Sequence, residues 1–513
     1  MKFIKDGIHM KYKNPILPGF HPDPSICRVG DDFYLITSTF EFFPGVPIYH
    51  SKNLINWELI GYCLTEESQL SLKNSKPSSG IYAPTLRYRN GMFFMTATNV
   101  TRGGNFIVHT NNICGQWSEP VWVKQGGIDP SLFWDDDGKC YFISNGSANR
   151  EDGYGIFLCE IEPFTGEMLT NSYKLTNGCG GRCAEAPHIY KKDGWYYLML
   201  AEGGTEYGHM VTIQRAKNIY GPYEQCRNNP ILTHRNSPEN PIQATGHADI
   251  VEDQNGNWWL LCLGIRPIPK VMLHPLGRET FLSPLTWNED GWPTVGNCGE
   301  IALEMEGELP GPAQKPVNLG FEDNFESGKL HLRWNFVRNP KRECYRIEKG
   351  RVILIGGEDN LSTPRGAPTM IAVRQQEFCM DMLVRLEGEV QIGSSAGLTA
   401  FYNSDYHYDI LITKEADGCH YVCLHKRVAD IDVIVARRPI DFKGSIQLKI
   451  TSDSEWYTFY YENDGEFTEL GRGRTSLLCT EITHTMTFTG TYFGIFSEKG
   501  EIAVTFASLK NLP

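Results

Sequence analysis

Five short segments of the chain join a turn signal to an apolar run rich in aromatic residues. Four of them carry Asn-Gly or Asp-Gly before the run, and these dipeptides favour tight hairpin turns because both residues tolerate positive φ. We therefore expect each segment to form the turn and second strand of a β-hairpin. The segments are DDFYLIT (31–37), NGMFFMTAT (90–98), DGKCYFIS (137–144), DGWYYLML (193–200) and NGNWWLLC (255–262).

A second motif precedes each of these segments at nearly the same distance. It lies where the first strand of each hairpin should begin, and its recurrence predicts one structural unit used five times. The copies are Asp23-Pro24-Ser25, Ala83-Pro84-Thr85, Asp129-Pro130-Ser131, Ala186-Pro187-His188 with Glu185 just ahead, and His247-Ala248-Asp249.

The length of the repeat leaves room for four short strands in each unit. Equivalent aromatic residues of successive units are 47 to 62 residues apart. Five units of four antiparallel strands predict an all-β fold, a five-bladed β-propeller over residues 12–305. A flat meander or a sandwich with accidental internal similarity is the alternative.

The repeat stops at a segment with the composition of a linker. Residues 306–318, EGELPGPAQKPVN, contain three Pro and two Gly, which predicts a linker. Beyond it, stretches such as 381–393, 396–413 and 455–463 alternate apolar and polar residues between Gly, Asn and Asp, as short antiparallel strands do. We expect a two-sheet β-sandwich over residues 319–513.

Composition narrows the functional class. The 513 residues carry 48 Lys and Arg against 61 Asp and Glu, a net charge of −13, which argues against nucleic acid as a partner. No apolar run is long enough to span a membrane, and the N-terminal residues do not resemble a secretory signal. The 15 scattered Cys indicate reduced thiols and a cytoplasmic protein. A homo-oligomer is compatible with these features.

Three acidic residues occupy the repeated motif. In a propeller the first strands of all blades face a central channel, so Asp23, Asp129 and Glu185 should meet there. A lone Asp-Pro is most simply a turn whose Asp caps the backbone, but three acids at matched positions favour catalysis. In a desolvated site, the charge of one carboxylate raises the pKa of its neighbour. One group can then stay protonated as an acid while the other is ionised as a base. With the abundant aromatic residues, this indicates glycosidic bond cleavage.

Several stretches resemble glycoside hydrolase family 43. They cover most of residues 12–305 and include the segment 15–57 around HPDPS, GIDPSLFWDDDGK (127–139), EAPHIYKKDGWYYLMLAEGGTEYGHM (185–210), GHADIVEDQNGNWWLLCLGIRP (246–267) and LGRETFL (276–282). The resemblance implies inverting exo-enzymes that remove terminal β-xylose or α-L-arabinofuranose from cell-wall oligosaccharides.

The resemblance also implies roles for individual residues. Asp23 would be the general base that activates water, Glu185 the general acid, and Asp129 the group that raises the proton affinity of the acid and orients it. The other implied roles are sugar contact by Arg266, Phe43 and Tyr82 in substrate binding, and support of a central calcium ion by His247. No cofactor is implied for the chemistry itself.

Variation at the expected aromatic positions favours one branch of the family. Tyr82 stands where Trp is usual, and Phe42-Phe43 stand where a Trp is common, which resembles the branch rich in α-L-arabinofuranosidases. The alternatives are a β-xylosidase acting on xylo-oligosaccharides and a non-catalytic carbohydrate-binding propeller. A retaining fructan hydrolase is disfavoured because the chain lacks the Asn-Asp-Pro-Asn and Arg-Asp-Pro motifs.

The second domain has two alternative roles. It resembles the lectin-like domain that follows many catalytic domains of this family, and it either binds carbohydrate or packs on the propeller and lends a loop to the site. We favour packing, with an aromatic residue of FTGTYF (488–493) reaching the leaving-group side.

Overall fold

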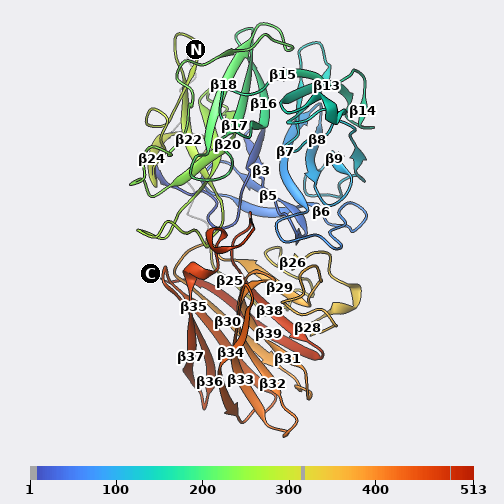
Figure 1. Ribbon diagram of the computed structural model, residues 1–513, viewed down its shortest axis with the longest axis vertical. Coiled ribbons are helices and arrows are strands. Elements are labelled where there is room, and N and C mark those ends of the chain that lie inside the picture. The colour runs from blue at the N-terminus through green and yellow to red at the C-terminus, as the bar shows by residue number, and fades with distance from the viewer. Residues whose placement is uncertain (1–7, 313–317, 486, 513) are drawn as a thin grey trace.

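The computed structural model describes residues 8–312, 318–485 and 487–512, and it is built almost entirely of β-strands (Figure 1). This confirms the all-β class. The helical elements of the described residues are single 3₁₀ turns: η1 (Arg150–Asp152), η2 (Arg342–Cys344), η3 (Thr475–Leu477) and η4 (Thr480–Ile482).

The N-terminal part of the chain forms five successive antiparallel sheets, which fill the upper half of Figure 1. Each sheet is a meander in chain order, and in the third one β15 pairs with β13. The strands are β2 (Ser25–Val29), β3 (Asp32–Ile36), β5 (Gly45–Ser51) and β6 (Glu58–Leu64); β7 (Ile81–Arg89), β8 (Met92–Asn99), β9 (Gly104–Thr110) and β10 (Val121–Trp122); β11 (Ser131–Trp134), β12 (Cys140–Ser144), β13 (Ile156–Glu162), β14 (Glu167–Met168) and β15 (Tyr173–Thr176); β16 (Glu185–Lys192), β17 (Trp195–Glu202), β18 (Met210–Ala216) and β19 (Glu224–Gln225); β20 (Gln243–Glu252), β21 (Trp258–Ile265), β22 (Glu279–Trp287) and β23 (Pro293–Val295).

The five predicted hairpins are confirmed. The first strand of each sheet pairs antiparallel with the second, which carries the aromatic run. Turn residues such as Asn90, Gly91, Asp193 and Gly194 have positive φ, as the turn dipeptides require.

The first strands contact one another in chain order, and β2 also contacts β20, so the sequence of contacts closes on itself. Apolar clusters fill the space between each pair of neighbouring sheets, including the fifth and the first. Leu35 of β3 and Leu261 of β21, for example, belong to the cluster that joins those two sheets. The starts of all five first strands are thereby brought together.

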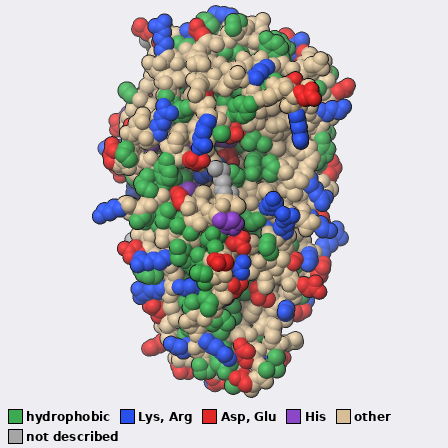
Figure 2. Space-filling model, in the orientation of Figure 1, with side chains coloured by type: hydrophobic (Ala, Val, Ile, Leu, Met, Phe, Trp, Pro, Cys, Tyr) green, Lys and Arg blue, Asp and Glu red, His purple; other side chains and the backbone are tan. Residues whose placement is uncertain are grey.

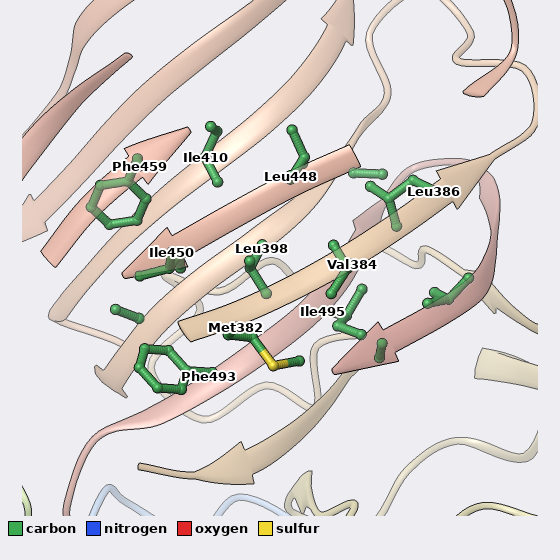
Figure 3. Close-up of a cluster of buried hydrophobic side chains, with 14 of the residues drawn as sticks. Met382, Val384, Leu386, Leu398, Ile410, Leu448, Ile450, Phe459, Phe493 and Ile495 are labelled. Carbon is green, nitrogen blue, oxygen red and sulfur yellow. The ribbon is translucent and has the colours of Figure 1, made fainter. Parts of the chain in front are cut away.

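The C-terminal part is a two-sheet sandwich, in the lower half of Figure 1. Side chains of both sheets meet in one core, in which Met382 and Ile450 of one sheet lie near Leu398 and Phe493 of the other (Figure 3). One sheet contains β25 (Phe321–Asp323), β27 (Tyr345–Glu348), β28 (Arg351–Ile355), β30 (Met380–Glu387), β35 (Ser445–Ser452), β36 (Trp456–Asn463), β37 (Glu466–Arg474) and β39 (Glu501–Asn511), and the other contains β29 (Met370–Arg374), β31 (Ser395–Asn403), β32 (Tyr406–Lys414), β33 (His420–Val428), β34 (Ile431–Ile440) and β38 (Tyr492–Glu498).

The boundary between the two parts differs in detail from the prediction. β1 (Ile8–Lys13) pairs with β24 (Glu304–Leu309), so the first sheet-rich part begins before residue 12, and the predicted linker 306–318 begins inside a strand. Of that linker, residues 313–317 lie outside the described residues. Backbone pairing with β1 explains why residues 306–309 are ordered despite their composition.

The two parts are joined by strand pairing as well as by side chains. β4 (Phe42–Phe43) of the N-terminal part pairs with β26 (Phe336–Val337) of the C-terminal part. Buried Arg338 donates from Nε to the carbonyl of Ser75 at 2.7 Å, and its backbone N–H donates to the carbonyl of Glu41. The C-terminal part is therefore fixed to the N-terminal sheets near the start of the chain.

The distribution of surface charge and the state of the cysteines are consistent with the composition. Acidic and basic side chains are interspersed over the face seen in Figure 2, without a continuous basic area. No helix within the described residues has both the length and the apolar character needed to cross a bilayer. All 15 Cys are free thiols, and most are buried.

Candidate active site

The backbone turns into the left-handed region at four of the five repeated motifs. Asp23 has φ 55°, Asp129 53°, Ala186 49° and His247 47°. Residues other than Gly rarely adopt this conformation, and it concentrates at functional sites. The shared backbone shape shows that Ala186 is the residue equivalent to Asp23 and Asp129, with Glu185 one position earlier.

Asp23 is fully buried and surrounded by hydrogen-bond donors. Its Oδ1 accepts from Nη1 of Arg278 at 2.9 Å, and its Oδ2 accepts from the hydroxyl of Ser38 at 2.5 Å. Nδ1 of His247 lies 3.6 Å from Oδ1. Burial alone would raise the pKa of Asp23, but Arg278, His247 and Ser38 outweigh it and hold the pKa below its usual value. Asp23 is therefore ionised at neutral pH.

Glu185 and Asp129 have the opposite electrostatic environment. Burial, followed by the charge of Asp23, raises the pKa of Glu185 to about 7. Burial, followed by the charges of Glu185 and Asp23, raises the pKa of Asp129 well above its usual value. The site therefore pairs a carboxylate with carboxyl groups that retain their protons near neutral pH, the division of labour needed for general acid–base catalysis.

Aromatic rings line the site beside Arg278. The guanidinium carbon of Arg278 lies 5.5 Å from the ring centre of Phe40 and 5.3 Å from that of Phe488. Phe40 and Phe488 stack at 5.5 Å, and Tyr82 lies 5.1 Å from Phe40 and 5.7 Å from Phe488. Asp129 and Asp23 are among the charges that raise the pKa of Tyr82, so Tyr82 lies near the acids.

Phe488 brings the C-terminal part to the site. Its backbone carbonyl accepts from Nη2 of Arg278 at 3.3 Å, and its N–H donates to the hydroxyl of Ser78 at 2.9 Å. Phe488 belongs to the segment FTGTYF, from which an aromatic residue was expected to reach the site. The contact of Phe488 with Arg278 supports the packing role of the second domain.

Two of the predicted substrate-binding residues lie elsewhere. Arg266 donates to Glu279 at 2.7 and 2.8 Å and to Glu377 at 2.8 Å, so its guanidinium joins the two parts of the chain and contacts none of the three acids. Phe43 lies in β4 and packs against the core of the sandwich. The arginine that contacts a predicted catalytic acid is Arg278, and the aromatic residue of that segment at the site is Phe40.

Arg278, which contacts Asp23, is the main residue of the candidate site that the sequence analysis did not assign. It stands in LGRETFL (276–282), a stretch that carries the family resemblance, and that membership was the available signal. Its Nε is buried and has no hydrogen-bond partner within the described residues. A buried donor of this kind is costly unless a ligand or water accepts from it.

The calcium ion expected beside His247 stays a prediction. Calcium takes six to eight oxygen ligands, whereas the charged neighbours that affect the pKa of His247 are Asp23, Arg278 and Asp249. Asp23 is bound to Arg278, and Asp249 is bound to Arg87 at 2.8 Å. These two carboxylates already have cationic partners, and the reaction assigned to the three acids uses no metal at this position.

Comparison with models of known protein families shows which family the chain belongs to. The sequence model of glycosyl hydrolases family 43 matches residues 12–293, and that of the β-xylosidase C-terminal concanavalin A-like domain matches residues 322–508. The chain belongs to glycoside hydrolase family 43. It is therefore a glycosidase with a lectin-like second domain, and family 43 enzymes need no cofactor for their chemistry.

Individual family 43 proteins match over nearly the whole chain. A non-reducing end α-L-arabinofuranosidase of Bacteroides ovatus is 40% identical over 497 residues, covering 95% of this chain and 91% of its own. A xylosidase/arabinosidase of Butyrivibrio fibrisolvens is 39% identical, covering 80% of this chain and 81% of its own. The crystal structure of a xylan β-1,4-xylosidase of Bacillus halodurans has a TM-score of 0.91 and 33% identity, covering 97% of this chain and 100% of that one.

Proposed function

We propose that the protein is an exo-acting, inverting glycosidase that releases terminal α-L-arabinofuranose, and also β-D-xylose, from oligosaccharides derived from plant hemicellulose. The observation that carries this proposal is the site in which the carboxylate of Asp23, held by Arg278 and Ser38, has a lowered pKa while nearby Glu185 has a pKa raised to about 7. The names of the relatives from Bacteroides ovatus and Butyrivibrio fibrisolvens support the two sugars. A β-xylosidase acting on xylo-oligosaccharides is the alternative, and the Bacillus halodurans relative supports it.

The three acids divide the reaction between them. Asp23 accepts a proton from the water that attacks the anomeric carbon, and Glu185 donates a proton to the departing glycosidic oxygen. Asp129 orients the acid, whereas burial and the charge of Asp23 disfavour ionisation of Glu185. Because water attacks from the face opposite the leaving group, the product has inverted configuration.

Arg278 supports both the base and the sugar. Its Nη1 holds Asp23 in the ionised form, and its buried Nε, which has no partner within the described residues, is a donor that a bound sugar or water would satisfy. Phe40, Tyr82 and Phe488 supply apolar surface against a sugar ring. In this proposal Arg278 has the role that the resemblance gave to Arg266.

The architecture of the catalytic part belongs to the same proposal. Five meander sheets whose first strands contact in a closed order fit a five-bladed β-propeller, in which the acids would surround the central channel.

Metal analysis of the purified protein would test for calcium beside His247.

Cell location and assembly are further parts of the proposal. The 15 free thiols favour a reducing, cytoplasmic location. Edge strand β34 exposes Ile431, Val433 and Ile434, and a second copy of the chain is the partner we propose for it, because exposed apolar edges pair with other strands. Light scattering after size-exclusion chromatography measures the assembly state.

The decisive experiment compares two small substrates. Purified enzyme should hydrolyse nitrophenyl α-L-arabinofuranoside with a higher kcat/KM than nitrophenyl β-D-xyloside, and both rates should fall by roughly a hundredfold in Glu185→Gln and Asp23→Asn variants. A preference for the xyloside would establish the alternative. Absence of hydrolysis of both, together with sugar binding, would establish a non-catalytic carbohydrate-binding protein.

A further inference from the structure

Three polar side chains, two of them buried and the third partly exposed, gather on the outer face of the sandwich, outside the candidate active site. His407 and Asp409 are two residues apart on β32 and therefore share one face of the sheet. His425 stands directly opposite Asp409 on β33. Tyr408 and Ile410, on the other face of β32, point into the core. Side-chain exposure is 1% for His407 and 4% for Asp409, so these groups do not simply face solvent.

The three side chains direct their ligand atoms at one point. Nδ1 of His407 lies 2.9 Å, and Nδ1 of His425 2.7 Å, from Oδ2 of Asp409. Each residue offers one ligand atom, and these atoms lie within 4.8 Å of one another. Among the described residues this is the one group of three or more His, Cys, Asp or Glu side chains that converges in this way.

The far side of each imidazole is held by a partner. Nε2 of His425 lies 2.6 Å from Oδ1 of Asp432 on β34, and Nε2 of His407 lies 3.1 Å from the hydroxyl of Ser362. Asp432 and Asp409 both only accept, so both ring nitrogens of His425 donate a hydrogen in the metal-free protein. A cation at Nδ1 would displace the hydrogen shared with Asp409, whereas Asp432 would keep the one at Nε2. Histidines that bind metals usually donate their other N–H to a carboxylate in this way.

The local charge favours a divalent cation. Asp405, Asp409 and Asp432 provide three carboxylates around the site, and Arg427 is the one guanidinium paired with them, at 2.8 Å from Asp432 and 3.3 Å from Asp405. Arg427 balances one of these three negative charges, so two are left without a guanidinium to balance them. A doubly charged ion bound to Asp409 would neutralise them.

We propose that His407, Asp409 and His425 form a zinc site in the sandwich domain, with water as the fourth ligand. Two imidazole nitrogens and one carboxylate oxygen are donors that suit zinc, whereas calcium needs more oxygen atoms. Ligands about 2.0–2.1 Å from zinc stand about 3.4 Å apart in a tetrahedron. Zinc binding therefore requires each imidazole to withdraw from Asp409 by roughly half an ångström.

The site would act on stability and not on catalysis. It joins β32 and β33 to the segment that carries Ser362, and the neighbouring Leu361 packs in a cluster with Phe20 and Phe40 of the catalytic part. A metal bridge at this position would stiffen the surface of the sandwich on which the catalytic part rests.

The experiment uses the full chain without a polyhistidine tag, treated with a chelator and dialysed. Isothermal titration with zinc chloride and metal analysis should find one tightly bound zinc ion per chain, and zinc should raise Tm by at least about 3 °C. His407→Gln and His425→Gln should each abolish the tight binding and the Tm increase. The matched control is His420→Gln, on the same strand as His425 but outside the cluster, which should retain both.

Cobalt provides a second readout that does not depend on stability. Cobalt(II) bound at the site should give the visible absorption bands of a tetrahedral complex, and both cluster variants should lose them. Circular dichroism and hydrolysis of a nitrophenyl glycoside will show that the variants are folded. The proposal is overturned if the folded wild-type chain binds no zinc, or if both cluster variants bind it as the wild type does, since the ion would then occupy exposed thiols or other histidines.

Discussion

Replacing Arg278 by Met should move the acidic limb of the pH–rate profile to higher pH. Asp23 must be ionised to act as the general base, and its pKa is held below the usual value chiefly by Arg278, against the effect of burial. The wild-type enzyme therefore loses activity only as the pH falls through this lowered pKa. Without the guanidinium, burial is opposed by His247, Ser38 and His209 alone, so protonation and loss of activity begin at higher pH.

The size of the effect follows from the contact between Nη1 of Arg278 and Oδ1 of Asp23, which is 2.9 Å long. At an effective dielectric constant of about 20, two unit charges at this distance attract by about 6 kcal/mol, an upper bound because the remaining groups and water relax. An arginine beside an aspartate typically changes the proton affinity by about a factor of 10 to 1,000. We therefore expect the acidic limb to move by about one to three pH units.

The assay is kcat/KM for nitrophenyl α-L-arabinofuranoside between pH 3 and 9, with circular dichroism at each pH to confirm folding. Removing one partner of a buried ion pair costs roughly 3–5 kcal/mol of stability, so Arg278→Lys is measured alongside. It keeps the positive charge, and its limb should lie between those of the wild type and Arg278→Met. Arg266→Met is the matched control, because Arg266 is also a buried, ion-paired arginine but contacts Glu279 and Glu377.

Two results would refute this reasoning. An acidic limb of Arg278→Met that coincides with that of the wild type, with kcat/KM lowered equally at every pH, would show that Arg278 binds sugar without controlling Asp23. A limb that moves in Arg266→Met and not in Arg278→Met would show that the pKa of Asp23 is controlled from Arg266 and not by its direct contact with Arg278.

Four further predictions concern the acid, the base and the second domain. The alkaline limb should lie at about pH 7, because burial and Asp23 raise the pKa of Glu185 to that value and activity is lost as the acid deprotonates; a limb above pH 9 in the same profiles would exclude Glu185 as the acid. A substrate with a good leaving group should partly restore the rate of Glu185→Gln but not that of Asp23→Asn, and equal rescue would mean that the roles are assigned wrongly. Proton NMR of the first-formed sugar should show inverted configuration, whereas a retained product would contradict water activation by Asp23. Expression of a chain ending near residue 310 should give insoluble or nearly inactive protein, and a soluble, fully active truncation would favour carbohydrate binding by the second domain.

The sequence predicted the repeated units because each unit carries its own local signals. Turn dipeptides such as Asn90-Gly91 fix the hairpins through positive φ, and the aromatic runs supply the clusters between sheets. The placement of Asp23 and Asp129 at equivalent positions followed from the same repeat. These features depend on neighbours in the sequence, which is why a single sequence was enough.

Contacts between distant segments were not predictable in the same way. Nothing near Arg266 or Arg278 shows which guanidinium meets Asp23, which is more than 240 residues away in the chain. Phe43 was assigned to substrate binding from its neighbourhood, but pairing of β4 with β26 draws it toward the sandwich. Strand β24, which overlaps the start of the predicted linker, was missed for the same reason. Its partner β1 is at the other end of the catalytic part.

The position of Arg278 connects the second domain to the acidity of the site. Thr491 donates from both its backbone N–H and its hydroxyl to the carbonyl of Pro275, at 3.0 and 3.1 Å. A Cβ on Gly277 would lie 2.9 Å from Cα of Gly490, so only glycine allows the two backbones to pass this closely. Both contacts are made by residues just before Arg278 in the chain, and Nη2 of Arg278 also donates to the carbonyl of Phe488. The loop of the sandwich thus orients the guanidinium that keeps Asp23 ionised, which gives the second domain a part in the chemistry although none of its residues transfers a proton.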